Sequence, residues 1–516
     1  MLTHAISELR RAFADDAREP RCIQTIPKRG YRLVAQVDAV GPASTPAASL
    51  ARDSIAVLPF ASMSADPEDE FLAGGITEAI INSLAQIKHL NVVARTSALP
   101  IKGNCNDVCA IGKRLNVRTV LLGSVRRSGS ELRITAQLAN AEDGYLLWSD
   151  RYDREAKHIF QIQDEIARLI AEGVKVTLTG GQERVVMAGT NNLEAYELYV
   201  KGRALLYRRG GDISRAAQCF EREIALVPDF ARAWAGLADS YTARGYYGLV
   251  RPELTMPRAL EAARRAVALA PSLAEGRNAL AMASLMGGWD RATAEREFLR
   301  ALELNPKYTQ ARDWYALFYL QLSEGRLADG VAQAKLALKS EPLSSYAHAI
   351  CGITCGCAGR HAEAVEAARR AVELDSESYL AQVILQGVLH SSGQLEESVA
   401  AGELALAMSG RLSWSLVFLA VTFAEWGKID DADALYAEML ARARRQYMSP
   451  AQLALAAAAA AREDEAIRHA RDAFEVGDPD CQVFFSRHLP YTAPLYAYPR
   501  FCEMIARNGR GNWLGR

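Results

Sequence analysis

A glycine recurs every 34 residues in the second half of the chain, and this spacing strongly constrains the fold. Apolar residues with helical periodicity flank each of these positions, so every unit reads as two helices joined by a turn. Such a unit cannot bury its apolar face alone, and stacked units form a solenoid. The period predicts an α-α solenoid over residues 192–477. The register is carried by Gly325, Gly359, Gly393 and Gly427, and Ala461 continues it.

The residues within each unit also follow a fixed pattern. Trp234 and Leu237 are placed to fill the gaps between helix pairs, whereas Ala216 lies where paired helices approach closely. We interpret Gly211 and Gly245 as the turns of the first two units, with an insertion near "VRPELTMPR". This pattern resembles tetratricopeptide repeats, with roughly seven units. Residues 478–516 are expected to cap the array.

The resemblance to tetratricopeptide repeats also implies a partner site. Stacked helix pairs form a superhelix with an extended concave face that suits a peptide or a partner helix. Tyr207 and Arg208 are candidates for that surface. We therefore expect a protein or peptide partner on the concave face.

Residues 54–179 alternate between strand-like and helix-like segments, which predicts an α/β domain. "SIAVLPF" indicates a buried strand, and "LAGG" is interpreted as a tight strand–helix turn. The acidic run Asp66, Glu68, Asp69 and Glu70 is interpreted as a solvated helix start. The segment is similar to the TolB-N-like module, which sits ahead of tetratricopeptide repeats in many bacterial regulators.

Residues 1–37 are basic although the whole chain has a net charge of −1. Residues 2–14 have the pattern of a helix, and "CIQTIPKRGYRLVAQV" indicates two strands around a Pro-Lys-Arg-Gly turn. A helix with a polar, arginine-bearing face suits a major groove, and a basic hairpin beside it can reach phosphates. Residues 38–53 are small and contain proline, which predicts a flexible linker.

The helix and the hairpin together resemble the C-terminal part of an OmpR/PhoB-type winged helix, especially in CadC-like regulators. "AISELRRAFADD" matches the recognition helix and "IQTIPKRGYRLVA" matches the wing. The family's domain has a sheet and two further helices ahead of this part, so residues 1–37 are expected to be a truncated domain. The resemblance implies DNA contacts by Thr3, Ser7, Arg10, Arg11, Thr25, Lys28, Arg29 and Tyr31.

The sequence shows no recognisable set of catalytic residues, so no enzyme activity is expected. The nine cysteines have no spacing typical of a zinc or iron–sulfur site, and neither a metal nor another cofactor is expected. Cys351 and Cys355 fall at positions of the repeat that pack in the core. No apolar run is long enough for a membrane span, which predicts a cytoplasmic protein without a membrane partner.

These observations predict a multidomain, mainly α protein with a winged-helix fragment, an α/β module and a tetratricopeptide solenoid. The function expected from the resemblances is a cytoplasmic transcriptional regulator that binds double-stranded DNA, with a possible homodimer on DNA. The alternative is a protein–protein interaction scaffold whose winged helix is a non-functional remnant.

Overall fold

The computed structural model describes residues 23–26, 30–33, 51–64, 67–85, 90–93, 107–128, 131–155 and 192–508, and the chain divides into two compact units, Met1–Ser49 and Leu50–Arg516. In the first unit, β1 (Ile23–Ile26) and β2 (Gly30–Leu33) pair in antiparallel fashion. The predicted hairpin is therefore confirmed in these strands.

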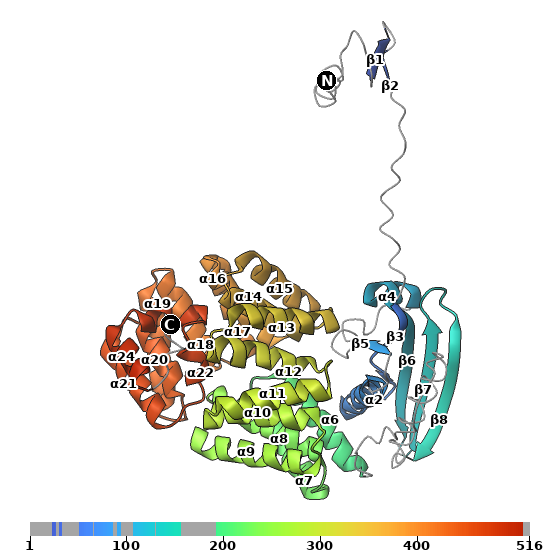
Figure 1. The fold of residues 1–516 in the computed structure, drawn as a ribbon, viewed down its shortest axis with the longest axis horizontal. Coiled ribbons are helices and arrows are strands. Elements are labelled where there is room, and N and C mark those ends of the chain that lie inside the picture. Colours follow the sequence, from blue (N-terminus) through green and yellow to red (C-terminus); the bar gives the residue numbers. More distant parts are fainter. Residues whose placement is uncertain are drawn as a thin grey trace. The chain divides into compact units, whose positions relative to one another are not determined.

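The second unit begins with a mixed sheet whose strand order is β5-β3-β6-β7-β8, with β4 paired to β6 (Figure 1). Strand β3 runs parallel to β5 and β6, whereas β6, β7 and β8 form an antiparallel meander. The elements are β3 (Ala51–Val57), β4 (Ala61–Ser62), α2 (Pro67–Ala85), β5 (Asn91–Val93), α4 (Val108–Leu115), β6 (Val117–Ser128), β7 (Glu131–Asn140) and β8 (Leu146–Glu155).

Two details of this domain differ from the sequence prediction. Strand β3 begins at Ala51, inside the segment 38–53 predicted as a linker. The "LAGG" segment is not a strand–helix turn, because Leu72–Gly75 lie inside α2, which begins at Pro67. Position 75 requires glycine because α2 packs closely on α6 (Leu193–Arg208). A Cβ atom on residue 75 would lie 2.2 Å from Cγ2 of Val200.

Replacing Gly75 by alanine should destabilise the protein by about 2 kcal/mol, since the new methyl group overpacks a closed contact with a stiff β-branched side chain. Urea denaturation followed by circular dichroism measures this change. The double variant Gly75→Ala/Val200→Ala should recover much of the loss. Gly211→Ala is the control, because no atom lies within 4 Å of its Cβ position. Additive effects of Gly75→Ala and Val200→Ala would contradict the packing argument.

Residues 192–477 form eight helix pairs among the described residues, one more than the roughly seven units predicted (Figure 1). The first helix of the fourth pair continues as a π-helix, η3 (Tyr315–Ser323). The other helices are α6, α7 (Asp212–Leu226), α8 (Ala231–Tyr246), α9 (Pro252–Leu269), α10 (Ala274–Gly288), α11 (Arg291–Leu304), α12 (Thr309–Trp314), α13 (Leu327–Ser340), α14 (Ser345–Cys357), α15 (His361–Leu374), α16 (Tyr379–Ser391), α17 (Leu395–Met408), α18 (Ser413–Glu425), α19 (Ile429–Ala443), α20 (Pro450–Ala459) and α21 (Glu463–Glu475).

The positions that recur every 34 residues are occupied by residues with a left-handed backbone conformation. In each of five helix pairs, this residue ends the first helix. The four glycines of the register have φ between 70° and 76°, and Ala461 has φ 56°. The interpretation of Gly211 and Gly245 as turns is wrong, because Gly211 has φ −63° and Gly245 lies inside α8. The left-handed glycines there are Gly210 and Gly248. Most of the predicted insertion "VRPELTMPR" lies in the first turns of α9, which has 18 residues, whereas α7 has 15 and α11 has 14.

Replacing Ala461 by glycine should raise the free energy of unfolding by about 0.5–1 kcal/mol, because alanine is strained at positive φ and glycine is not. Thermal or urea denaturation measures the gain. Ala358→Gly is the matched control, since Ala358 ends α14 with φ −87° and should lose stability on substitution. A loss of stability in Ala461→Gly would contradict the strain argument.

Candidate functional site

The predicted DNA-binding residues fall mostly outside the described residues. Thr25 and Tyr31 are described, and they lie directly opposite each other on β1 and β2. Thr25 is exposed and Tyr31 is half-buried. Directly opposite residues of an antiparallel pair share a face of the ribbon, so these two side chains belong to one surface. The remaining predicted contacts, Thr3, Ser7, Arg10, Arg11, Lys28 and Arg29, lie outside the described residues.

The acidic run at the start of α2 is only partly solvated. Glu70 is exposed, but Asp69 is buried, with its Oδ1 3.8 Å from Nη1 of Arg127. The same Nη1 donates to Oε1 of Glu197 on α6 at 2.6 Å. Burial raises the pKa of Glu197. The prediction of a solvated helix start is thus wrong for Asp69, because Arg127 of β6 draws this carboxylate into a contact between the sheet and the first repeat helix.

The inner side of the superhelix is filled in part by the chain's own C-terminal segment. Residues 478–492 include α22 (Cys481–Phe484) and the short helix η4 (Pro490–Thr492). Gln482 donates to the backbone oxygen of Leu285 at 3.4 Å, and Ser486 donates to that of Leu322 at 2.8 Å. Only the residues that follow, with α23 (Ala493–Tyr496) and α24 (Pro499–Arg507), cover the end of the array, where α24 contacts α21.

Aromatic rings form the centre of this packing. Trp414 on α18 donates through Nε1 to the backbone oxygen of Tyr246 at 3.1 Å, which joins the second helix pair to the seventh. The ring of Phe484 lies 5.2 Å from that of Trp414 between centroids, and the ring of Tyr491 lies 4.3 Å from that of Phe418. The concave face predicted for a partner is therefore occupied at its centre by residues of the same chain.

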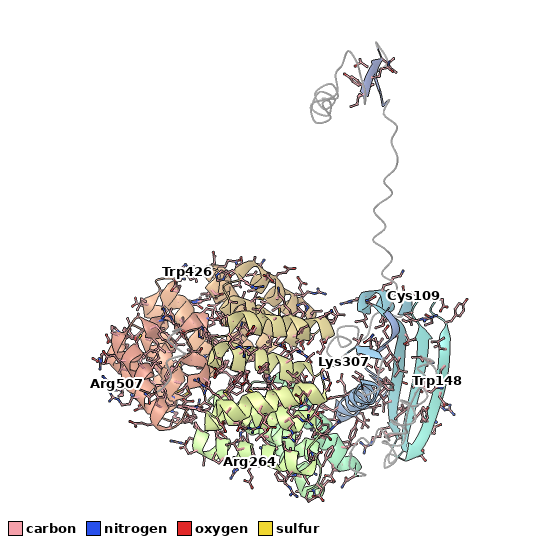
Figure 2. All side chains as sticks on the ribbon, viewed as in Figure 1. Cys109, Trp148, Arg264, Lys307, Trp426 and Arg507 are labelled. Carbon is pink, nitrogen blue, oxygen red and sulfur yellow. The ribbon has the colours of Figure 1, made fainter. Side chains whose placement is uncertain are left out.

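A cleft of about 1390 Å³ remains open beside this filled centre. One wall comes from α2 of the α/β domain, and the other comes from α6 and the first turns of later repeat helices. Tyr207 and Arg208, which were selected from the sequence, line it. Lys307, labelled in Figure 2, lies in the loop between α11 and α12, and its Nζ donates to the backbone oxygen of Leu90 at 3.1 Å.

Sequence reasoning missed the charged residues at the base of the cleft, Arg203 and Arg209, and the tyrosine at its side, Tyr308. No motif marks them, because they come from separate turns of the solenoid. The positions of Cys351 and Cys355 in the core are confirmed, since both thiols are buried. No helix in the described part of the chain is long and apolar enough to cross a membrane.

Residues 51–169 match the family model of the HilA/YgeH-like transcriptional regulator, second domain. The α/β domain is therefore of a kind found in transcriptional regulators, and a helical solenoid follows it. The TolB-N-like assignment stays a prediction, as does the OmpR/PhoB-type winged helix.

Three individual proteins are similar to parts of this chain. "Putative adenylate cyclase 3" of Rhizobium meliloti is 40% identical over 214 residues, which are 41% of this chain and 36% of that protein. The cholera toxin homolog transcriptional activator of Vibrio parahaemolyticus is 41% identical over 49 residues, 10% of this chain and 17% of that one. The matched segments thus span well under half of either relative. The solved structure of the APC/C hetero-tetramer Cut9-Hcn1 covers 62% of this chain and 57% of the matched chain, at 14% identity and a TM-score of 0.42.

Proposed function

We propose that the protein is a transcriptional regulator that binds double-stranded DNA through residues 1–37. The observation that carries the proposal is the match of residues 51–169 to the second domain of HilA/YgeH-like transcriptional regulators. The hairpin of β1 and β2 supports it, because a basic two-stranded ribbon ahead of such a domain can contact phosphates. In this proposal residues 1–37 are part of an OmpR/PhoB-type winged helix, and the α/β domain is TolB-like.

The proposal assigns the remaining parts of the chain to regulation rather than catalysis. The protein acts in the cytoplasm and binds DNA as a homodimer, and the repeat array offers its outer surface to a protein or peptide partner. No step of this function requires an enzyme activity, a metal or a cofactor.

Binding to a random-sequence duplex across a salt series tests the proposal. We expect the double variant Lys28→Ala/Arg29→Ala to weaken binding and to reduce the slope of log K against log salt by about 2, one for each lost phosphate contact. Arg264→Ala, an exposed arginine on α9 (Figure 2), is the matched control and should leave both quantities unchanged. Absence of binding, or equal salt slopes for all variants, would favour the scaffold alternative.

A further inference from the structure

Two buried arginines line the base of the cleft between α2 and the repeats. Arg203 lies on the last turns of α6, and Arg209 directly follows that helix. Each is only 8% exposed, yet both line the cleft. Arginine is rarely buried unless it is paired, so the partners of these two side chains need an account.

The polar atoms around these arginines lack partners. Among the described residues the neighbours of the Arg209 guanidinium group are aromatic rings and the charge of Asp239, and it forms no hydrogen bond or ion pair with a side chain there. Nε of Arg203 has no hydrogen-bond partner, and its Nη1 lies 4.0 Å from Oδ2 of Asp239, beyond hydrogen-bonding distance. The hydroxyl group of Tyr308, which also lines the cleft, has no partner either. Unpaired buried groups of this kind are costly and rare in folded proteins.

The nearby carboxylates act mainly on Arg203 and on a third arginine, and they leave Arg209 with Asp239 as its carboxylate neighbour. Glu275 lies 3.7 Å from that third arginine, Arg232, and is matched by it. Burial raises the pKa of Asp239 to about 7, so near neutral pH this carboxyl group carries only part of a negative charge. Glu78 on α2 also lines the cleft, and its charge acts on Arg203 and Arg232. The base of the cleft therefore keeps a positive centre at Arg209.

The backbone at Arg209 is strained. Its φ of 63° and ψ of −161° fall in a region that almost only glycine occupies. Two glycines, Gly210 and Gly211, follow at once, so the chain has the residue type that suits such a conformation next to this position. Backbone strain of this kind persists only where the surrounding structure holds the residue in place, and strained residues are more frequent at ligand-binding sites.

Aromatic rings surround the guanidinium group of Arg209. It lies 5.9 Å from the ring of Trp314, and the rings of Tyr207 and Tyr346 are 6.3 Å apart between centroids, edge to face. Arg209 also lines a small apolar cavity of about 60 Å³, together with Tyr246 and Trp414. The guanidinium group of Arg209 thus lies between the wide cleft and a narrow apolar cavity.

We propose that this cleft binds a small organic anion, whose carboxylate or phosphate group pairs with Arg209 and Arg203 and whose flat or apolar body lies among the tyrosine and tryptophan rings. Arginine presents a planar fork of donors that suits both head groups, and Tyr308 adds a hydroxyl donor. The rings supply apolar and stacking contacts for the body of the ligand. This inference is independent of DNA binding.

Isothermal titration calorimetry of the full chain with four probes tests the proposal. Benzoate and phenyl phosphate carry the two head groups on a ring, whereas acetate and inorganic phosphate carry them without one. We expect at least one ring-bearing probe to saturate the protein and to bind about tenfold or more tightly than its ringless counterpart. The tighter of the two ring-bearing probes identifies the head group. Failure of all four to bind below about 10 mM would overturn the proposal.

Variants at position 209 separate ligand binding from a structural role. Arg209→Gln should weaken the best probe about tenfold or more, while Arg264→Gln, which removes an exposed charge on α9, should not. Arg209→Gly should also lose binding but should resist urea at least as well as the wild type, because glycine relieves the strained backbone. Unchanged affinity in Arg209→Gly, or a strong loss of stability in it, would overturn the proposal. No DNA is present in this experiment, so its result is separate from that of the DNA-binding test.

Discussion

Replacing Phe484 by alanine should lower the free energy of unfolding by about 3–5 kcal/mol, the usual cost of removing a fully buried aromatic side chain. Phe484 is 0% exposed, and its ring packs against those of Trp414 and Phe418 at 5.2 and 5.5 Å between centroids. These partners belong to the seventh helix pair, so the cavity would open in the centre of the superhelix. The surrounding helices are held by their own pairs and can collapse little into that space.

Urea denaturation, followed by circular dichroism and by tryptophan fluorescence, measures this effect. Leu299→Ala removes a large apolar side chain that is 44% exposed and should change stability far less. If Phe484→Ala lowers the stability by less than about 1 kcal/mol, the C-terminal segment does not contribute to the core as described.

Replacing Glu223 by glutamine should stabilise the protein by about 5 kcal/mol at pH 8 and by little at pH 4. Glu223 on α7 is 0% exposed, neither of its carboxyl oxygens has a hydrogen-bond partner, and burial raises its pKa to about 9. A raised pKa means that the folded state holds the proton more tightly than the unfolded state. The stability that depends on this proton is fully present below the unfolded pKa near 4.5 and is lost as the pH rises toward 9. Glutamine does not titrate, so the variant avoids that loss.

The measurement is the free energy of unfolding of wild type and variant at several pH values between 4 and 9. Glu261→Gln, an exposed carboxylate on α9, is the control and should give a difference that does not grow with pH. A constant difference for Glu223→Gln across this range would show that the carboxyl group does not titrate abnormally in the folded state.

The repeat array could be predicted from the sequence because its signals are local. The left-handed turn at Gly359 needs glycine for steric reasons, and Cys351 packs at a position that recurs every 34 residues. The misplaced turn at Gly245 shows the limit, since its small size serves contact with Met256 rather than a positive φ. A glycine in the sequence indicates that a larger residue does not fit, but it does not show whether the reason is a positive φ or a close contact.

The position of residues 478–492 could not be predicted, because it depends on contacts between residues far apart in the chain. Nothing in the sequence around Ser486 indicates that its hydroxyl group donates to Leu322. The residues that line the cleft likewise divide into those that could be predicted from the sequence and those that could not. Tyr207 could be chosen as a candidate because it is a large side chain on a first helix. Arg203 and Arg209 could not be chosen in this way, because they are distinguished only by being buried at the cleft with few polar partners, which the structure alone shows.

The path of residues 478–492 has a consequence for the synthesis of the protein. A ribosome releases the N-terminal repeats first, and repeat arrays can begin to fold as soon as neighbouring units are available. Here Trp414 and Phe418 cannot be covered until Phe484 and Tyr491 have been synthesised. A nascent chain that stops before this segment keeps an exposed aromatic surface of the kind that chaperones and proteases recognise, so this surface is covered only in chains that extend through Tyr491.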